Sequence, residues 1–275
     1  MRRSHSIVIR VIAMVLTVGI LLTGGVVSAQ EDRIDPQALI EQILTVHQRQ
    51  QSQIEDISYD AEYVEGEETD RGFVEKVRLI KTIHIKYVGD SVLYSEQFHE
   101  YYKDGKLQPD KELKDEARER TKNRIEQNRR TIAHPMLEPF YPDNSNNYRI
   151  RYEGVNYDDV EGHICHEFVV RSTVDDADHI NGVYYFDADT FQLVRCNFSP
   201  AKLVKKTFFR LNRLDMTIDY AFTSDSTWWL PTRFEMEGEG KAAVFFGVHF
   251  SGTEYYRNPR VNTGIADTLF EVNYD

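Results

Sequence analysis

The sequence predicts a mainly β protein built on one extended antiparallel sheet of about eleven strands, with an early helix and a helical insertion. Three observations favour this class. Apolar and polar residues alternate through most of the chain, as they do in strands with one buried face. The 15 Phe, 16 Tyr and 2 Trp can cover a wide apolar face. Helical spacing is confined to two segments. The sequence contains no repeat, low-complexity tract or Gly/Ser linker, so a single domain over residues 30–275 is the simplest organisation.

The first helical segment covers residues 35–53. Asp35 is suited to cap the helix, and Pro36 fits the first helical position. A helix with a single apolar stripe must bury it, and the segments that follow are predicted strands. The stripe recurs at helical spacing through Leu39, Ile40, Ile43, Leu44 and His47.

The first group of strands lies between residues 57 and 102. Alternation begins at Ile57, and the acidic residues 65–72 are expected to form a turn before a long second strand. Gly89 and Asp90 then turn the chain into a third strand. The second strand places on one face Val77, Leu79, Ile83, Ile85 and Tyr87.

Residues 104–147 interrupt the strand pattern. Within them, 110–131 are densely charged, with few apolar residues near helical spacing. This pattern is typical of a solvated surface helix, and the alternative is a lid over a cavity. The proline-rich loop that follows is expected to bury Met136, Leu137, Phe140 and Tyr141.

Strands resume at Tyr148 and continue to residue 256. Gly238 and Gly240 are expected to form a hairpin turn before the last strand, and the tail after it to be a loop with a short helical turn. The expected strands lie near 148–152, 163–173, 181–187, 191–198, 204–211, 214–223, 228–236 and 243–256.

The first 29 residues have the three parts of a cleaved signal peptide. Three arginines precede an apolar run from Val11 to Leu22, and small residues at 27–29 fit a cleavage site after Ala29. The apolar run is shorter than the roughly 20 residues that span a bilayer. The sequence therefore predicts an exported, periplasmic protein with no permanent membrane anchor.

The charge of the chain opposes two classes of partner. The formal net charge of −12 falls by three, to −15, when the three arginines of the signal are removed. An acidic protein of this kind is not expected to bind nucleic acid or an anionic membrane surface by bulk electrostatics.

Two cysteines in an exported chain raise the question of a disulfide. The predicted register places Cys165 and Cys196 two strands apart and near opposite strand ends, beyond the ~7 Å limit for a bridge. We expect two free cysteines, with a disulfide as the alternative.

No motif in the sequence predicts catalysis. Nucleophile elbows, phosphate-binding loops and zinc-protease helices are absent from it. His163 and Cys165 share a face of their strand while His166 points the other way, so this segment alone does not supply a zinc site. We expect no enzyme activity, no metal and no cofactor.

Large apolar side chains recur on one face of the late strands. A curved sheet with only two helices to cover it can leave an apolar cleft, and ligand sites favour such linings. The alternative is that these residues form an ordinary packed core. The candidate ligand-binding residues are Met216, Ile218, Tyr220, Phe234, Met236, Phe246 and Val248.

In four segments the chain resembles the periplasmic lipoprotein-carrier superfamily with the LolA/LolB-like fold. These segments are Gly162–Val170, Val183–Val194, Met216–Tyr220 and Trp229–Pro231. The resemblance implies an open antiparallel half-barrel of about eleven strands, covered by the early helix and the insertion, around an apolar cavity.

The resemblance also implies a function. It suggests a non-enzymatic carrier or sensor that shelters lipid acyl chains or lipoproteins, with an envelope protein as a further partner. The alternative is a structural or interaction module of the cell envelope with a filled core and no ligand.

Overall fold

The computed structural model describes residues 34–89, 91–127, 136–203, 205–206, 209–242 and 246–271. The chain divides into two compact units, Met1–Asp35 and Pro36–Asp275, and the second is described below. The predicted signal peptide, residues 1–29, lies outside the described residues, so its cleavage and the 30–275 domain boundary stay predictions.

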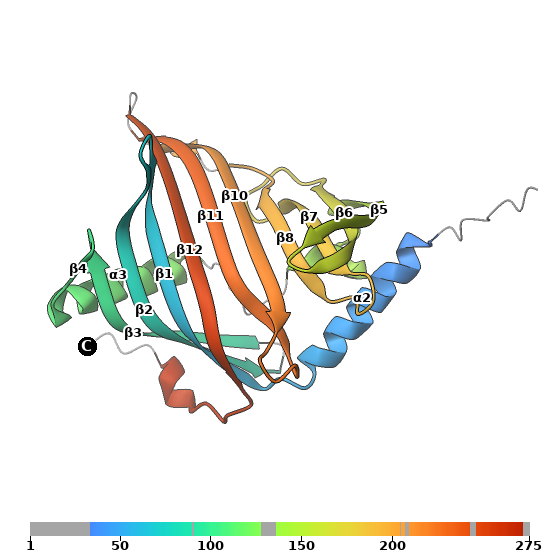
Figure 1. Ribbon diagram of the computed structural model, residues 1–275, viewed down its shortest axis with the longest axis horizontal. Coiled ribbons are helices and arrows are strands. Elements are labelled where there is room, and N and C mark those ends of the chain that lie inside the picture. The colour runs from blue at the N-terminus through green and yellow to red at the C-terminus, as the bar shows by residue number, and fades with distance from the viewer. Residues whose placement is uncertain are drawn as a thin grey trace, which may run out of the picture. The chain divides into compact units, whose positions relative to one another are not determined.

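Twelve strands in the described chain form one antiparallel sheet, and eleven of them lie on a single path (Figure 1). The path runs β4-β3-β2-β1-β12-β11-β10-β8-β7-β6-β5, and β9 pairs with β10 beside it. This confirms the predicted mainly β fold. The strands are β1 (Asp56–Thr69), β2 (Gly72–Val88), β3 (Ser91–Lys103), β4 (Lys106–Leu107), β5 (Tyr148–Val160), β6 (His163–Ser172), β7 (Ile180–Asp187), β8 (Leu193–Pro200), β9 (Lys205–Lys206), β10 (Phe209–Phe222), β11 (Trp229–Ala242) and β12 (Phe246–Val261).

The first and last long strands pair with each other. Antiparallel register joins β1 to β12 from the pair Ile57 and Val261 to the pair Gly66 and Ser251. Because the path still ends at β4 on one side and β5 on the other, the sheet is open, as expected for a half-barrel.

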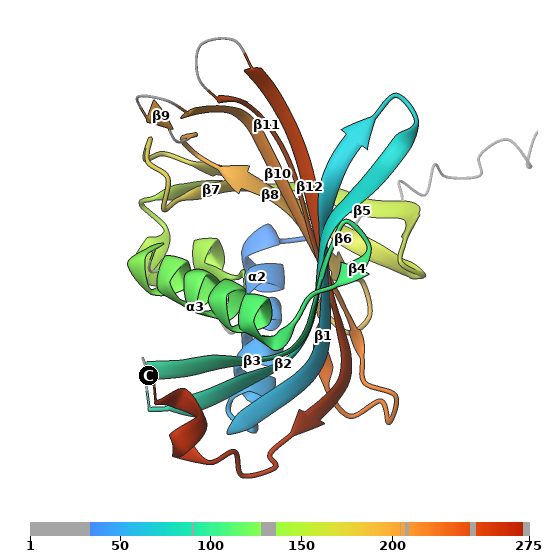
Figure 2. The ribbon, with the colours of Figure 1, turned by 90° about the vertical axis from the view of Figure 1, so that its left-hand side faces the viewer.

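Two α-helices, α2 (Pro36–Gln51) and α3 (Asp110–Gln127), lie on the same side of the sheet (Figure 2). We call this side the helix-bearing face. The stripe of α2 is buried there through Leu39, Ile43 and Leu44, which confirms the helix expected from apolar spacing. No helix in the described ranges is long and apolar enough to cross a membrane.

The charged helix α3 is fixed on the helix-bearing face by two of its side chains. Leu113 packs beside Tyr63, Leu79 and Tyr101. The guanidinium of Arg120 lies 4.9 Å from the ring centre of Tyr63. One side of the helix therefore rests on the sheet while most of its described residues stay exposed, as expected of a surface helix, and the lid remains the untested alternative.

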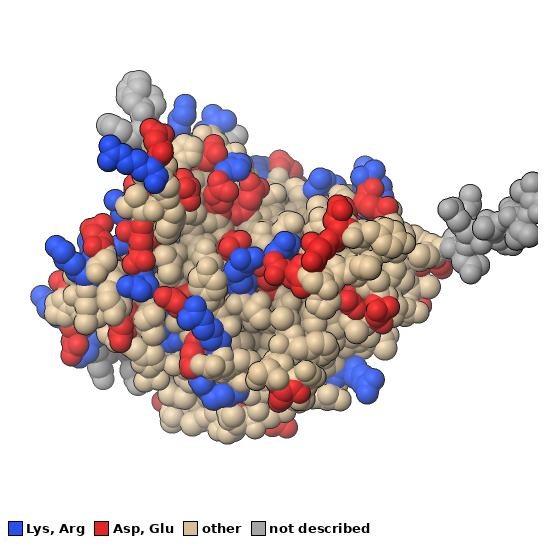
Figure 3. Space-filling view, viewed as in Figure 1, with Lys and Arg blue, Asp and Glu red and all other residues tan. Residues whose placement is uncertain are grey.

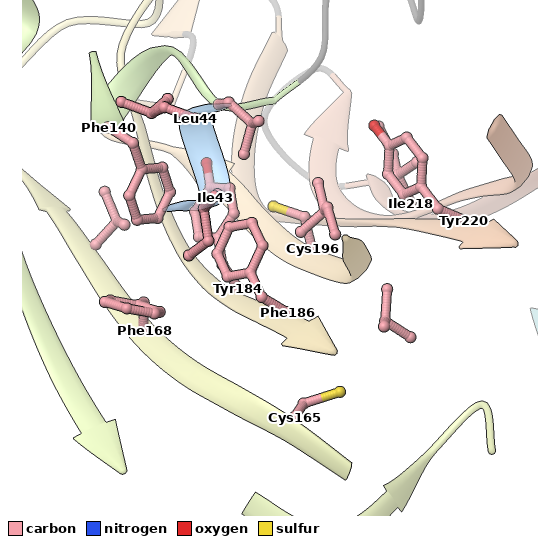
Figure 4. Close-up of a cluster of buried hydrophobic side chains, with 14 of the residues drawn as sticks. Ile43, Leu44, Phe140, Cys165, Phe168, Tyr184, Phe186, Cys196, Ile218 and Tyr220 are labelled. Carbon is pink, nitrogen blue, oxygen red and sulfur yellow. The ribbon is translucent and has the colours of Figure 1, made fainter. Parts of the chain in front are cut away.

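The segment after α3 inserts two short 3-10 helices, η1 (Glu138–Phe140) and η2 (Pro142–Asn144), and a third, η3 (Asp267–Phe270), follows β12. Leu137 and Phe140 are buried, and Met136 and Tyr141 pack partly buried against the same core. The loop therefore buries the apolar residues expected of it. Figure 4 shows Phe140 above Phe168, with Tyr184 beside them.

The largest core cluster lies between α2, the 136–141 segment and strands β5–β11. Its members come from both halves of the chain, so the core depends on long-range contacts. They include Ile43, Leu44, Phe140, Phe168, Val170, Tyr184, Phe186, Val194, Cys196, Ile218, Tyr220 and Trp229.

Three local expectations were wrong. The acidic residues 65–69 continue β1, so the turn is confined to Asp70 and Arg71. The strand expected near 214–223 begins earlier, because β10 extends continuously from Phe209. Gly238 and Gly240 lie inside β11 and not in a turn. A Cβ on Gly238 would lie 2.2 Å from the ring of Phe250, so a larger residue would not fit there. Gly238 therefore serves packing between paired strands.

Both cysteines are free and buried, as expected. Cys165 lies on β6 and Cys196 on β8, with β7 between the two strands. Burial raises the pKa of the Cys165 thiol to about 12, so it stays protonated at neutral pH.

Charges of both signs are interspersed on the face shown in Figure 3. At the centre of one cluster, Asp219 is buried and accepts hydrogen bonds from Arg195 and Arg233, at 2.6 and 2.8 Å. Since β10, β8 and β11 each contribute one of these residues, the cluster ties three neighbouring strands together.

Asp56 holds the segment after β12 in place. Its carboxylate accepts hydrogen bonds from the backbone N–H groups of Thr263, Gly264 and Ile265, at 2.8, 2.9 and 3.1 Å. Burial by itself would raise the pKa of Asp56, but together these bonds lower it below the usual value.

We expect the docking of residues 262–265 to weaken in acid. Because the folded-state pKa of Asp56 is lowered, its stabilisation is present above the unfolded pKa of about 3.9 and is lost as the pH falls through the lowered value. Asp56→Asn should cost about 2 kcal/mol of unfolding free energy at pH 7 and flatten the acid dependence. Hydrogen exchange of residues 262–265, followed as the pH is lowered from 7 through the pKa of Asp56, measures how firmly the segment is docked in each protein. Equal exchange profiles for Asp56→Asn and the unsubstituted protein would contradict the role of Asp56 in holding the segment.

Candidate ligand-binding pocket

A pocket lies where the C-terminal half of α2 faces β1, β2, β7, β8, β10 and β11. The space open to the centre of a water molecule is about 60 Å³. A cavity of this size has room for more than one water molecule. The pocket is lined by Ile43, His47, Gln50, Gln51, Ile54, Ile57, Tyr59, Ile85, Tyr87, Leu137, Phe186, Phe191, Gln192, Leu193, Tyr220, Trp229, Leu230 and Pro231.

Helix α2 supplies one wall because its buried stripe continues to its C-terminal end. Ile43 and His47 are four residues apart and so lie on one helix face. Gln50 fixes this end of the helix: its Nε2 donates to the carbonyl of Trp229 at 2.8 Å, and its Oε1 accepts from the Trp229 N–H at 3.0 Å. The side-chain amide thereby pairs with both backbone polar groups of Trp229 at the start of β11.

Three tyrosines bring hydroxyl groups to the lining. Burial raises the pKa of Tyr87 to about 12 and that of Tyr59 well above its ordinary value. Burial also raises the pKa of Tyr220, whose hydroxyl hydrogen-bonds to the backbone of Met136. All three phenols are therefore neutral at neutral pH, and Tyr220 links the pocket to the segment after α3.

No Asp, Glu, Lys or Arg occurs among the described lining residues. The one side chain with an ordinary pKa near neutrality is His47, and burial lowers that pKa. The imidazole is therefore neutral at pH 7, and the pocket carries no formal charge.

Of the residues predicted to contact a ligand, Tyr220 lies at the pocket. Ile218 is buried in the largest core cluster, and Phe234 packs beside it, partly buried. Met216 and Met236 face each other across β10 and β11, on the same side of the sheet. Phe246 and Val248 belong to β12, but their side chains lie outside the described residues. Contact with a ligand stays a prediction for all seven.

Sequence reasoning missed the polar residues at the end of α2. His47 was predicted as part of the apolar stripe, whereas Gln50 was expected on the solvent side of the helix, which the structure shows to be wrong. A histidine within such a stripe indicates a polar atom directed at a buried surface, which is the signal that could have found them.

A second polar group, the ionic cluster of Lys81, Glu96 and Glu254, is buried on the helix-bearing face. Lys81 Nζ donates to Glu96 Oε1 at 2.8 Å and also pairs with Glu254. The side chains of the three residues are 7%, 5% and 13% exposed. Tyr94 and Tyr256 donate to the two carboxylates at 2.9 and 2.8 Å. The cluster is internally paired, and none of its members lines the pocket.

The histidines singled out in the sequence have separate partners. His163 Nδ1 lies 2.7 Å from Asp187 Oδ2, and His166 Nδ1 lies 2.9 Å from the Tyr152 hydroxyl. No group of three or more His, Cys, Asp or Glu suited to a metal occurs among the residues the structure describes. His163 lies at the start of β6 and His166 inside it, and each is held by its own partner.

The sheet and the helices α2 and α3 form an open half-barrel. No protein-family model matches the chain, and no curated protein matches it. Among solved structures, it is similar to a Vibrio parahaemolyticus domain described as an outer membrane lipoprotein-sorting protein. The identity is 12% and the TM-score 0.45, over 84% of this chain and 97% of that one.

Two further solved structures are similar. A DUF1329 family protein from Desulfovibrio piger is 11% identical, with a TM-score of 0.44 over 86% of this chain and 96% of that one. A LolA superfamily protein from Nitrosomonas europaea is 9% identical, with a TM-score of 0.37 over 86% and 98%. Similarities at this level concern the fold alone, so the function must be argued from the pocket.

Proposed function

We propose that this chain is a periplasmic, non-enzymatic carrier or sensor that shelters part of a lipid acyl chain in the pocket. The observation that supports it is the lining: aliphatic and aromatic side chains from α2 and six strands, with no charged residue among those described. Concave apolar sites with a few polar groups are the usual form of small-molecule sites.

The affinity of such a site comes from the ligand's alkyl groups. Each CH₂ removed from water contributes about 0.8 kcal/mol. The space open to the centre of a water molecule is only about 60 Å³, so an acyl chain must widen the pocket as it enters. The walls to move are α2 and the segment around Leu137, because both rest on the sheet through side chains and belong to no strand.

Release then requires the walls to move again, because a long chain bound by its alkyl groups leaves slowly. A second envelope protein that docks at this opening is a suitable recipient or signalling partner. The net charge of about −15 after signal cleavage keeps the carrier away from anionic membrane surfaces while loaded.

The test begins with native mass spectrometry of the mature protein from the periplasm, followed by organic extraction, where a co-purifying lipid or acylated peptide is expected. The matching variant is Gln192→Trp, because Gln192 lines the pocket and is only partly buried. Filling the pocket with an indole should weaken binding of the uncharged fluorescent probe N-phenyl-naphthylamine by about tenfold, or ~1.4 kcal/mol.

Gln97→Trp is the control, since Gln97 is exposed on β3 and does not line the pocket. It should bind the probe like the unsubstituted protein. A clean apo mass together with equal probe binding by both variants would reject the carrier and favour an envelope interaction module with a filled core.

A further inference from the structure

The pocket contains one buried polar atom without a partner. His47 Nε2 makes no hydrogen bond to any described residue, although the atom is buried. The imidazole is held by a side-chain hydrogen bond with Gln51, one turn further along α2. Leaving a buried nitrogen unsatisfied costs free energy, so a ligand atom that bonds to it would be favoured.

The surroundings of His47 limit the chemistry of that ligand. The other titratable groups in the lining are Tyr59, Tyr87 and Tyr220, all neutral at neutral pH. An ionised carboxylate or phosphate placed here would be desolvated with no cation to pair with. A hydroxyl can donate and accept, so it satisfies Nε2 in either tautomer of the neutral imidazole.

We propose that the pocket selects uncharged apolar ligands that carry a hydroxyl group, with His47 Nε2 as its hydrogen-bond partner. This inference rests on the proposed carrier function and specifies its ligand class. Alkyl burial supplies the affinity, while His47 fixes the position and polarity of the ligand's polar end.

The experiment compares three ligands of similar length by calorimetry with the mature protein at pH 7.5: decanol, chlorodecane and decanoate. We expect decanoate to bind at least about tenfold more weakly than decanol. His47→Phe should weaken decanol binding about three- to tenfold and leave chlorodecane unchanged. His249→Phe, at a largely exposed histidine outside the pocket, should change neither affinity.

A measurement on the unsubstituted protein covers the case in which His47→Phe does not fold. Decanol should shift the NMR resonance of the His47 Nε2 nitrogen, and chlorodecane should not. Three outcomes would overturn the hydroxyl preference while leaving the carrier function in place. They are equal NMR shifts with decanol and chlorodecane, an equal loss of affinity for these two ligands in His47→Phe, and tighter binding of decanoate than of decanol. No binding of decanol, chlorodecane or N-phenyl-naphthylamine would overturn the carrier function itself.

Discussion

Lys81→Met is expected to lower the free energy of unfolding by about 3–5 kcal/mol, because it leaves two buried carboxylates without their cation. Lys81 lies between Glu96 and Glu254 on the helix-bearing face, and all three side chains are nearly inaccessible to solvent. The carboxylates would keep the hydrogen bonds from Tyr94 and Tyr256, which do not neutralise their charge. Urea unfolding of the mature protein at pH 7 measures the loss.

Two further variants separate burial from charge. Lys202→Met removes an ion pair with Asp175 whose side chains are 58% and 79% exposed, and should cost less than about 1 kcal/mol. Combining Lys81→Met with Glu96→Gln and Glu254→Gln should restore most of the lost stability, because no charge then remains in the cluster. If the free energy of unfolding of Lys81→Met lies within about 1 kcal/mol of that of the unsubstituted protein, the two carboxylates are hydrated or protonated without Lys81 and the expectation is wrong.

The position of this cluster shows both the strength and the limit of strand periodicity. The alternation of Leu79, Ile83 and Ile85 predicts which face of β2 is buried, and the structure confirms it. Lys81 is the polar member of the same series, so its burial could have been predicted from its place in the sequence. Its two partners lie on β3 and β12, and no local pattern indicates that β12 returns to pair with β1.

The pocket could not be predicted from the sequence, because it too depends on contacts between segments that are distant in the sequence. The sequence predicted a sheet with large apolar residues on one face, and Ile218 and Tyr220 are buried there. Where space remains on that face depends on how α2 packs across strands far from it in sequence. Its stripe indicates that the helix is buried but not against which strands, so the hydrogen bonds of Gln50 to Trp229 could not be foreseen.

Whether Gly238 and Gly240 form a turn or lie within a strand is decided by the packing around them. A strand interrupted by Gly238 and Gly240 is a reasonable hairpin prediction, because glycine favours turns. In β11 the missing Cβ of Gly238 leaves room for the ring of Phe250 on the paired strand. The two explanations have the same sequence signature, and they differ only in what lies opposite.

Phe140→Ala is expected to cost about 3–5 kcal/mol of unfolding free energy, the range for truncating a fully buried phenylalanine. The ring is 4% exposed and makes edge-to-face contacts with Phe168, Tyr184 and Phe186, with centroid distances of 5.8, 5.0 and 5.4 Å. Truncation leaves a cavity among rigid aromatic rings that cannot collapse easily. The matched control is Phe73→Ala, at a phenylalanine that is 46% exposed, which should cost about 1 kcal/mol or less.

The same variant tests whether the segment after α3 positions the pocket. Phe140 does not line the pocket, but Leu137 in the same segment does, and the Tyr220 hydroxyl is bonded to the backbone of Met136. Losing the Phe140 anchor should therefore raise hydrogen exchange over residues 136–147 and weaken binding of N-phenyl-naphthylamine. A destabilised variant that binds the probe normally would show that α2 and the strands shape the pocket without this segment. Weaker binding would instead make the segment a movable wall of the pocket, whose position depends on the packing of the Phe140 ring.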